Sequence, residues 1–241
     1  MNKKKYRLAV LATILALLLP SVGFAQVGEH RNTFSVGVNV GMDFNQISFE
    51  PTIQQKFHTS PSIGLSLRYV CEKYFSTICA IQVEINYARL GWNEEILDSK
   101  SNPLPDTYQR DLHYVQIPFL ARLGWGREQK GFQFYVLAGP QVGYCFKEKE
   151  VFGDTWTVDA SGNPIRPNGM YAQYGMSLDH KFDYGISAGL GVEWSTSIGH
   201  FNFDGRYYYG QSDVFGNSKK DVFSRSANGT IMGKLTYFID L

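Results

Sequence analysis

The sequence lacks an apolar run long enough to form a transmembrane helix. Such a helix needs about 20 consecutive apolar residues, and the run over residues 8–19 is too short. An excess of charge of one sign is also lacking, because 23 Lys and Arg stand against 22 Asp and Glu. These absences exclude a helical membrane protein, and they give no indication of a nucleic-acid partner or a polybasic lipid anchor.

The N-terminus has the parts of a secretory signal peptide. A basic segment precedes the apolar run, and the small-x-small sequence Gly23-Phe24-Ala25 follows it. This order is typical of a cleaved export signal. We therefore predict a signal peptide over residues 1–25 and one mature domain over residues 26–241.

Cysteine is scarce, with three residues in the chain. Cys71 and Cys79 lie symmetrically about Phe75, on either side of the short link between two predicted strands, so a hairpin would place them opposite one another. In an oxidising compartment they could form a cross-strand disulfide. The alternative is two small apolar residues on one face. Cys145 has no evident partner, and no Cys follows the cleavage site closely enough for a lipoprotein anchor.

Apolar and polar residues alternate in eight stretches of the mature chain. In residues 112–125, for example, Val115 and Ile117 belong to one set of alternate residues, and Tyr114 and Gln116 belong to the other. Each such set is called a parity here, and its side chains lie on one face of the strand. A period of two indicates a strand with one apolar and one mostly polar face. The other stretches are residues 34–44, 62–71, 78–92, 132–146, 182–194, 200–210 and 229–241.

The connections between these stretches alternate in length. The long, polar ones are residues 45–61, 93–111, 147–181 and 211–228, and the short ones are residues 72–77, 126–131 and 195–199. Short periplasmic turns and long extracellular loops are typical of outer-membrane barrels. The sequence therefore predicts an all-β fold, an eight-stranded antiparallel up-and-down transmembrane β-barrel in the cell outer membrane.

Alternation alone leaves open which face meets lipid. A soluble lipocalin-like barrel would turn its apolar parity inward, but it would expose more charge than the Gly, Ser and Asn of the other parity supply. Aromatic residues near the strand ends favour the membrane, because they suit interfacial girdles. These residues are Phe34, Tyr69, Tyr87, Trp92, Trp125, Tyr144, Trp194, Tyr207 and Tyr237.

With the polar parity inside, charges of both signs share the lumen. An eight-stranded barrel is just wide enough for side chains to fill it, and a buried charge is tolerated when it is paired. We expect a structural network of ion pairs, and the alternative is a narrow pore or proton path through the same residues. They are Asp43, Arg68, Glu84, Arg122, Asp183, Glu193, Asp204, Arg206, Lys234 and Asp240.

Two prolines interrupt the predicted strands. Pro118 and Pro140 both fall in mid-strand, where each removes a hydrogen-bond donor from the ladder. A closed barrel has no free edge to accommodate the loss. We therefore expect a β-bulge or a local widening at these positions.

Three ordered segments of the chain resemble the PorT-like family of outer-membrane β-barrel proteins. They are YVQIPFL at 114–120, AGP at 138–140 and GISAGLG at 185–191, and they match strands that recur in this order in that family, prolines included. The resemblance implies an integral outer-membrane barrel, similar in architecture to OmpX and the OmpA membrane domain. PorT itself is linked to protein secretion and surface export. Such barrels often end in an aromatic residue, whereas this chain ends in Leu241.

Patterns for catalysis or ligand binding are absent from the sequence. His113 and Ser212 would be the reactive pair of an outer-membrane lipid-modifying enzyme, but no spacing motif links them. The histidines have no metal-ligand spacing, and we interpret Glu148, Glu150 and Asp154 as a solvated charged loop. We therefore expect no catalytic residues, no metal site and no cofactor.

The long loops are the predicted functional part, above all residues 147–181. Loops on a rigid scaffold carry function more often than the scaffold does. We expect a non-enzymatic protein with Phe152, Trp156 and Tyr171 as contact residues, unless these side chains pack the loop onto the barrel rim. The alternatives are a secretion-associated barrel, a small channel and a lipid-modifying enzyme. Expected partners are outer-membrane lipid, the barrel-assembly machinery and a protein at the loops.

Overall fold

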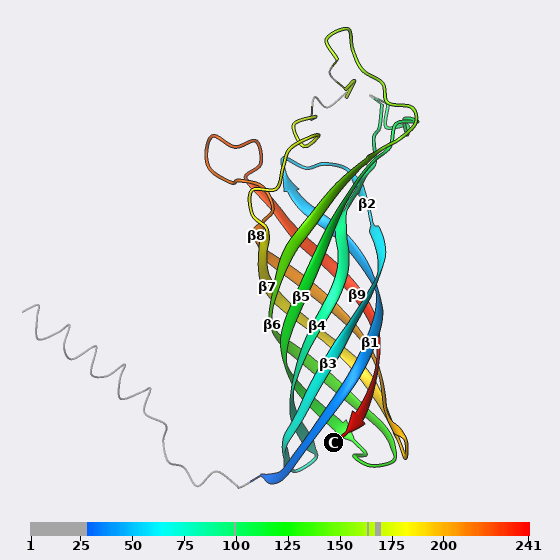
Figure 1. Ribbon diagram of the computed structural model, residues 1–241, viewed down its shortest axis with the longest axis vertical. Helices are drawn as coiled ribbons and strands as arrows, with labels where there is room; N and C mark the ends of the chain where they lie inside the picture. Colours follow the sequence, from blue (N-terminus) through cyan, green and yellow to red (C-terminus); the bar gives the residue numbers. More distant parts are fainter. Residues whose placement is uncertain (1–27, 99, 163, 167–169) are drawn as a thin grey trace, which may run out of the picture.

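The computed structural model describes residues 28–98, 100–162, 164–166 and 170–241, and the predicted signal peptide lies outside these residues. None of the described segments forms a helix that is long and apolar enough to cross a bilayer. Eight long strands form a tall cylinder (Figure 1). They are β1 (Glu29–Glu50), β3 (His58–Tyr74), β4 (Thr77–Glu94), β5 (Tyr108–Gly126), β6 (Gly131–Phe152), β7 (Phe182–Thr196), β8 (Gly199–Asp213) and β9 (Arg225–Asp240).

The cylinder is a closed antiparallel barrel. Each long strand pairs with its neighbours in the chain, and β1 pairs with β9 to complete the ring. A short strand, β2 (Gln55–Lys56), pairs with the end of β4. The tight turns gather at one end, here called the short-turn end, and the long connections at the other, the long-loop end (Figure 1). This arrangement confirms the predicted eight-stranded antiparallel barrel.

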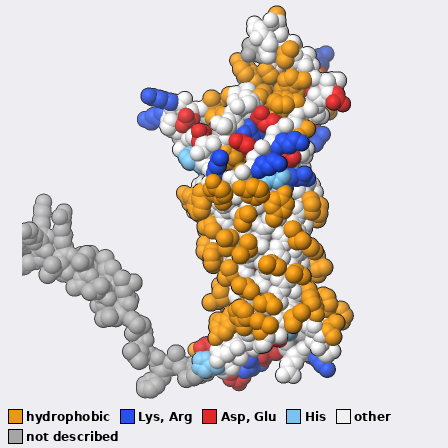
Figure 2. Space-filling view, viewed as in Figure 1, with side chains coloured by type: hydrophobic (Ala, Val, Ile, Leu, Met, Phe, Trp, Pro, Cys, Tyr) orange, Lys and Arg blue, Asp and Glu red, His pale blue; other side chains and the backbone are white. Residues whose placement is uncertain are grey.

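The outer wall carries a continuous apolar belt. Side chains of the apolar parity point outward from every long strand, and Leu190 (69 % exposed) and Leu65 (62 %) are among the most exposed. Figure 2 shows this belt between two ends that carry the charged side chains. Because soluble monomers rarely expose so large an apolar surface, the belt is the part of the wall that faces lipid.

The lumen is filled by side chains of the polar parity, which are buried throughout the barrel. Glycines on this face make room for large neighbours. A Cβ atom built on Gly191 would lie 2.5 Å from the Tyr135 ring, and one on Gly37 would lie 2.7 Å from the Phe238 ring. Except at the short-turn end, the barrel interior is therefore a packed core, as expected for eight strands.

Several strands extend well beyond their predicted ends. The prediction ended them too early because the outer face becomes polar and the inner face becomes apolar at the long-loop end. In β1 the outward residues change from Phe44 to Gln46, whereas the inward residues change from Asn45 to Ile47 and Phe49. The wall there meets water outside and apolar side chains inside. The prediction that residues 45–61 form a polar connection was therefore wrong, because most of this segment is strand.

The prolines interrupt the ladder without a bulge. On both sides of Phe119 and Leu120 the pairing between β5 and β6 keeps one register, from Pro118 with Gln141 to Ala121 with Ala138. Two residue pairs are missing between these points, but a Cβ atom built on Gly139 would lie 1.9 Å from the carbonyl oxygen of Phe119, so β5 and β6 stay close together and the expected bulge or widening was wrong here. The register shifts lie elsewhere, for example between His113 and Tyr114.

Of the two alternatives for Cys71 and Cys79, the disulfide is not formed, and both cysteines are free thiols. A register shift between Val70 and Glu72 pairs Cys79 with Glu72 instead of Cys71. The sequence symmetry about Phe75 assumed a regular hairpin. The bulge moves Cys71 out of the position directly opposite Cys79.

Candidate functional site

The central layer of the lumen is organised around Glu84 on β4. Its carboxylate accepts hydrogen bonds from Arg206 on β8 (2.8 Å) and Lys234 on β9 (2.7 Å). Arg206 also pairs with Asp204, which accepts a hydrogen bond from the hydroxyl of Tyr135 (2.9 Å). All five side chains are buried. These contacts tie β4 to strands on the opposite side of the barrel and fill the space between them.

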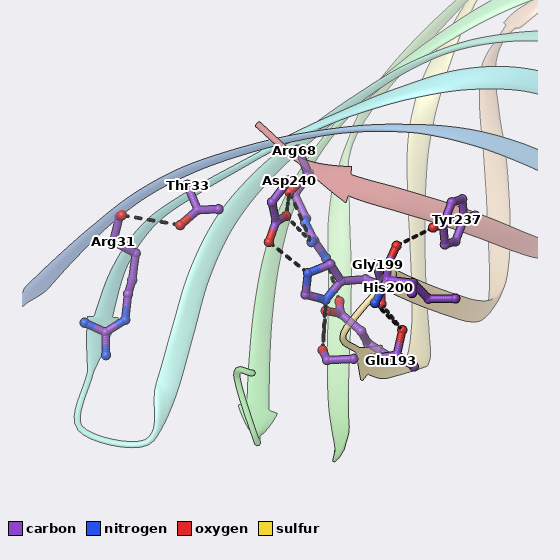
Figure 3. Close-up of polar contacts among 12 residues, drawn as sticks. Arg31, Thr33, Arg68, Glu193, Gly199, His200, Tyr237 and Asp240 are labelled. Atoms are coloured by element: carbon purple, nitrogen blue, oxygen red, sulfur yellow. Dashed lines mark hydrogen bonds and ion pairs between the residues drawn. The ribbon is translucent and has the colours of Figure 1, made fainter. Parts of the chain in front are cut away.

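A second layer lies nearer the short-turn end and is organised around Glu193 on β7 (Figure 3). Its carboxylate binds the guanidinium groups of Arg68 (2.6 Å) and Arg122 and lies 2.8 Å from the Nδ1 atom of His200. His200 Nε2 lies 3.0 Å from the carboxylate of Asp240. Five strands therefore converge on one network of charges.

This second layer is the floor of a cavity of about 920 Å³ at the short-turn end. Arg68, Arg122, Glu193, His200 and Asp240 all line it. The cavity is the lower part of the lumen, which the side chains above leave open. In the orientation usual for these barrels it faces the periplasm.

Two buried carboxylates nearer the long-loop end depart from the expected pairing of opposite charges. Asp183 accepts hydrogen bonds from Ser212 and from Asn228 (3.1 Å), and Asp43 accepts one from Ser62 (3.1 Å). No ion pair joins either aspartate to another described residue. Hydroxyl and amide donors therefore take the place of cations at these positions, and the other eight predicted residues form ion pairs.

Sequence reasoning missed His200, although its position offered a signal. The residue has the same parity as Asn202, Asp204 and Arg206, which are inward-facing. It was placed at the start of the predicted strand 200–210 but was left out of the lumen network, so its inward position was not used. A histidine on the inward parity beside a charged lumen is the pattern that would have identified it.

Ser195, His200 and Asp240 have contacts that resemble a catalytic triad. Ser195 Oγ lies 2.9 Å from His200 Nδ1, and His200 Nε2 lies 3.0 Å from Asp240. A nucleophile must reach its substrate, but Ser195 is buried, does not line the cavity, and donates a hydrogen bond to Glu193 (3.1 Å). In this structure the three residues are part of the charge network.

The structure does not bring His113 and Ser212 together. His113 contacts the hydroxyl of Tyr87 (2.7 Å) and packs between the rings of Tyr87 and Phe146. Ser212 instead donates to the lumen carboxylate Asp183. The partners of His113 and those of Ser212 are different residues, and no contact joins the two side chains. No group of three or more metal-binding side chains occurs among the described residues either.

An apolar cap closes the lumen at the long-loop end. Trp92 is fully buried there, with its ring 5.1 Å from Phe49 and 6.2 Å from Phe215. The cap combines strand ends with residues of the long loops, and its buried members are Ile47, Phe49, Ile53, Ala88, Leu90, Trp92, Ile96, Tyr108, Leu112, Tyr114, Cys145, Leu178, Val214, Phe215 and Phe223.

Buried arginines tie the longest loop to the barrel wall. Arg110 on β5 pairs with both Glu148 and Glu150 on β6 and donates to the Met176 carbonyl (2.6 Å). The prediction of a solvated charged loop was therefore wrong for these two glutamates. Their charges are neutralised by an arginine that the sequence places in a different connection.

A second buried arginine, Arg166, braces the outer part of the same loop. It pairs with Asp106 (3.0 Å) in the neighbouring loop and lies 4.4 Å from the centre of the Trp156 ring. Trp156 also packs against Phe152, with ring centroids 4.8 Å apart. Of the three predicted contact residues, Trp156 packs into the loop, while Phe152 (43 % exposed) and Tyr171 (46 %) remain accessible.

The brace at Asp106 is expected to fail in acid. Burial favours the neutral form of Asp106, but hydrogen bonds from Thr157 and Arg166 outweigh it and hold its pKa below the usual range. Since the pKa is lower in the folded state, the carboxylate stabilises the loop above about pH 4 and this stabilisation is lost as pH falls through the folded-state pKa. The protection of the amides of residues 155–158 against hydrogen exchange, relative to the intrinsic exchange rate at each pH, should fall over that range.

Substitution separates this effect from general acid unfolding. In Asp106→Asn the exchange of residues 155–158 should already be fast at pH 7, because the ion pair with Arg166 is gone. Asp154→Asn removes an equal charge from the loop that contains residues 155–158 and should leave their exchange unchanged. Equal exchange in the wild type and Asp106→Asn at pH 7 would show that Asp106 does not brace the loop.

Comparison with known proteins agrees with this architecture. The family model "Outer membrane protein beta-barrel domain" matches residues 24–216, which is most of the chain. No curated protein matches the sequence.

Solved structures with a similar fold include three barrels. Ail of Yersinia pestis has 12 % identity and a TM-score of 0.36, over 88 % of this chain and 99 % of that one. Neisserial surface protein A has 13 % identity and a TM-score of 0.40, over 85 % and 96 %. The outer membrane enzyme PagL has 11 % identity and a TM-score of 0.38, over 84 % and 98 %. Similarities at this level do not indicate an activity. The family match itself shows that the chain belongs to the outer membrane protein β-barrel domain family.

Proposed function

We propose that this protein is a non-enzymatic outer-membrane barrel whose long extracellular loops, above all residues 147–181, are held as a contact surface, and that residues 147–181 carry the contact with a partner. The observation that carries the proposal is the bracing of the longest loop. Buried Arg110 and Arg166 fix its two halves through ion pairs with Glu148, Glu150 and Asp106. A loop held this firmly is pre-organised, which reduces the entropy lost on binding.

The braced loop keeps apolar side chains on its outer surface. Val158 (47 % exposed), Ile165 (49 %) and Tyr171 stand with Phe152 beyond the barrel rim, and Figure 2 shows apolar side chains at this end, above the band of charges. Exposed apolar groups on an ordered loop favour contact with another macromolecule. The packed lumen and the apolar cap argue against a channel, so we expect no conductance in planar bilayers.

Site-specific photo-crosslinking in intact cells tests this proposal. A photo-reactive amino acid at Val158 or Tyr171 should give a discrete protein adduct, and protease added outside the cells should remove it. Val222 is as exposed as Val158 but lies in a different loop, so a label there is the matched control and should give no adduct. Absence of any adduct at positions 158 and 171 would contradict the proposal.

The same experiment distinguishes this proposal from the secretion-associated alternative that the PorT-like resemblance implies. A partner in export would meet the barrel from the periplasm, at the short turns. A label at Gln129, in the turn between β5 and β6, would then give the adduct in place of the loop positions. We expect the loop positions to react.

A further inference from the structure

We propose that the cavity at the short-turn end binds a small periplasmic oxyanion that carries two or more negative charges as carboxylate or phosphate groups. The site is independent of the extracellular loops. Its volume of about 920 Å³ lies within the range of pockets for small ligands. It is open at the periplasmic mouth of the barrel and closed above by the charge network of Glu193.

The lining of the cavity carries an excess of positive charge. Its acidic residues are Glu128, Glu193 and Asp240, and its basic residues are Arg31, Arg68, Lys73, Arg122, Arg127 and Lys130. His200 adds to the excess whenever it is protonated. A concave site with charge of one sign concentrates the field and raises the local concentration of counter-ions.

Some of the basic side chains form ion pairs with acidic residues, and others have no acidic partner in the described part of the chain. At the rim, Glu128 binds both Arg31 (2.6 Å) and Lys73 (2.6 Å). The hydrogen bond from Arg31 lowers the pKa of Glu128 to about 2, so the carboxylate stays charged and keeps both partners at neutral pH. The side chains of Arg127 and Lys130 have no partner in the described part of the chain, although both line the cavity.

The floor supplies donors that are held in place but only partly used. Arg68 and Arg122 share one oxygen of Glu193, and the buried Nε atom of each has no hydrogen-bond partner. Their orientation is fixed by aromatic rings, since Arg68 lies 4.6 Å from the centre of the Phe238 ring and Arg122 lies 3.9 Å from that of Tyr135. Oriented guanidinium groups suit carboxylate and phosphate oxygens.

The test uses the purified full barrel in nanodiscs of zwitterionic lipid, so that lipid charge does not compete. Isothermal titration at low salt should show one site for inorganic pyrophosphate, for citrate, or for both. Binding of pyrophosphate alone assigns a phosphate ligand, and binding of citrate alone assigns a carboxylate ligand. Affinity should fall as NaCl is added, because charge attraction is screened.

The informative variant is Arg127→Gln/Lys130→Gln, because neither side chain holds a structural contact. Loss of two partly screened charges should raise the Kd by about three- to tenfold. Lys219→Gln/Lys220→Gln removes two exposed lysines at the opposite end of the barrel and should leave the Kd unchanged. The proposal is overturned if neither anion binds in the millimolar range, or if both double variants weaken binding equally.

Discussion

Replacing Glu84 with Gln is expected to lower the free energy of unfolding by about 3–5 kcal/mol. The change keeps the shape of the side chain but removes the carboxylate that forms an ion pair with Lys234, and it takes one of two carboxylates from Arg206. Both cations are buried at the centre of the lumen and cannot turn to water. Denaturant unfolding in lipid vesicles, followed by tryptophan fluorescence, measures the loss.

Two further variants distinguish charge imbalance from simple loss of packing. Glu84→Gln/Lys234→Met leaves Arg206 with Asp204 as a balanced pair, so it should recover at least half of the lost stability. Glu72→Gln removes a carboxylate that is 35 % exposed and pairs weakly with His30, and it should cost less than about 1 kcal/mol. If Glu84→Gln costs no more than Glu72→Gln, the lumen network does not stabilise the barrel.

Replacing Trp92 with Ala is expected to cost about 3–5 kcal/mol and to open the apolar cap. Trp92 touches the rings of Phe49, Tyr108 and Phe215, which come from two strands and a long loop. Its loss leaves a cavity where these segments meet. The long loops should then be cut by protease added from outside, while the belt of the barrel stays protected.

Trp194→Ala is the matched control for the cap. It is the same substitution on a side chain that points outward at the short-turn end, beside Phe132 and Phe201. It removes contacts with lipid and should leave the loops as resistant as in the wild type. Identical loop cleavage in Trp92→Ala and the wild type would show that Trp92 does not hold the loops.

The membrane-spanning part of the fold could be predicted because lipid imposes one rule on every strand. Outward residues such as Val38, Leu65 and Leu190 must be apolar, so the period of two remains visible from Phe34 to Ile239. Above the belt the rule reverses. Ile47 and Trp92 point inward there. The belt pattern ends before Ile47, and the prediction that Trp92 belongs to an outward aromatic girdle was wrong, because its side chain is fully buried.

The candidate sites were predicted less completely, because they depend on register and on contacts between distant segments. Parity alone places Glu84 and Arg206 inside, but their pairing across the lumen depends on how the barrel closes. The pairing of Arg110 with Glu148 likewise depends on which residues of β5 and β6 face each other. A single register shift was enough to separate Cys71 from Cys79 in the ladder.

Fluorescence quenching from the lipid phase tests most directly whether the apolar face of each strand contacts lipid. In a variant with its native cysteines replaced by serine, a fluorophore on a single introduced cysteine at Leu65 or Leu190 should be strongly quenched by spin-labelled acyl chains. The same fluorophore at Val158, in the longest loop beyond the belt, should not be quenched. Absence of quenching at positions 65 and 190 would contradict a barrel that spans the membrane with this face outward.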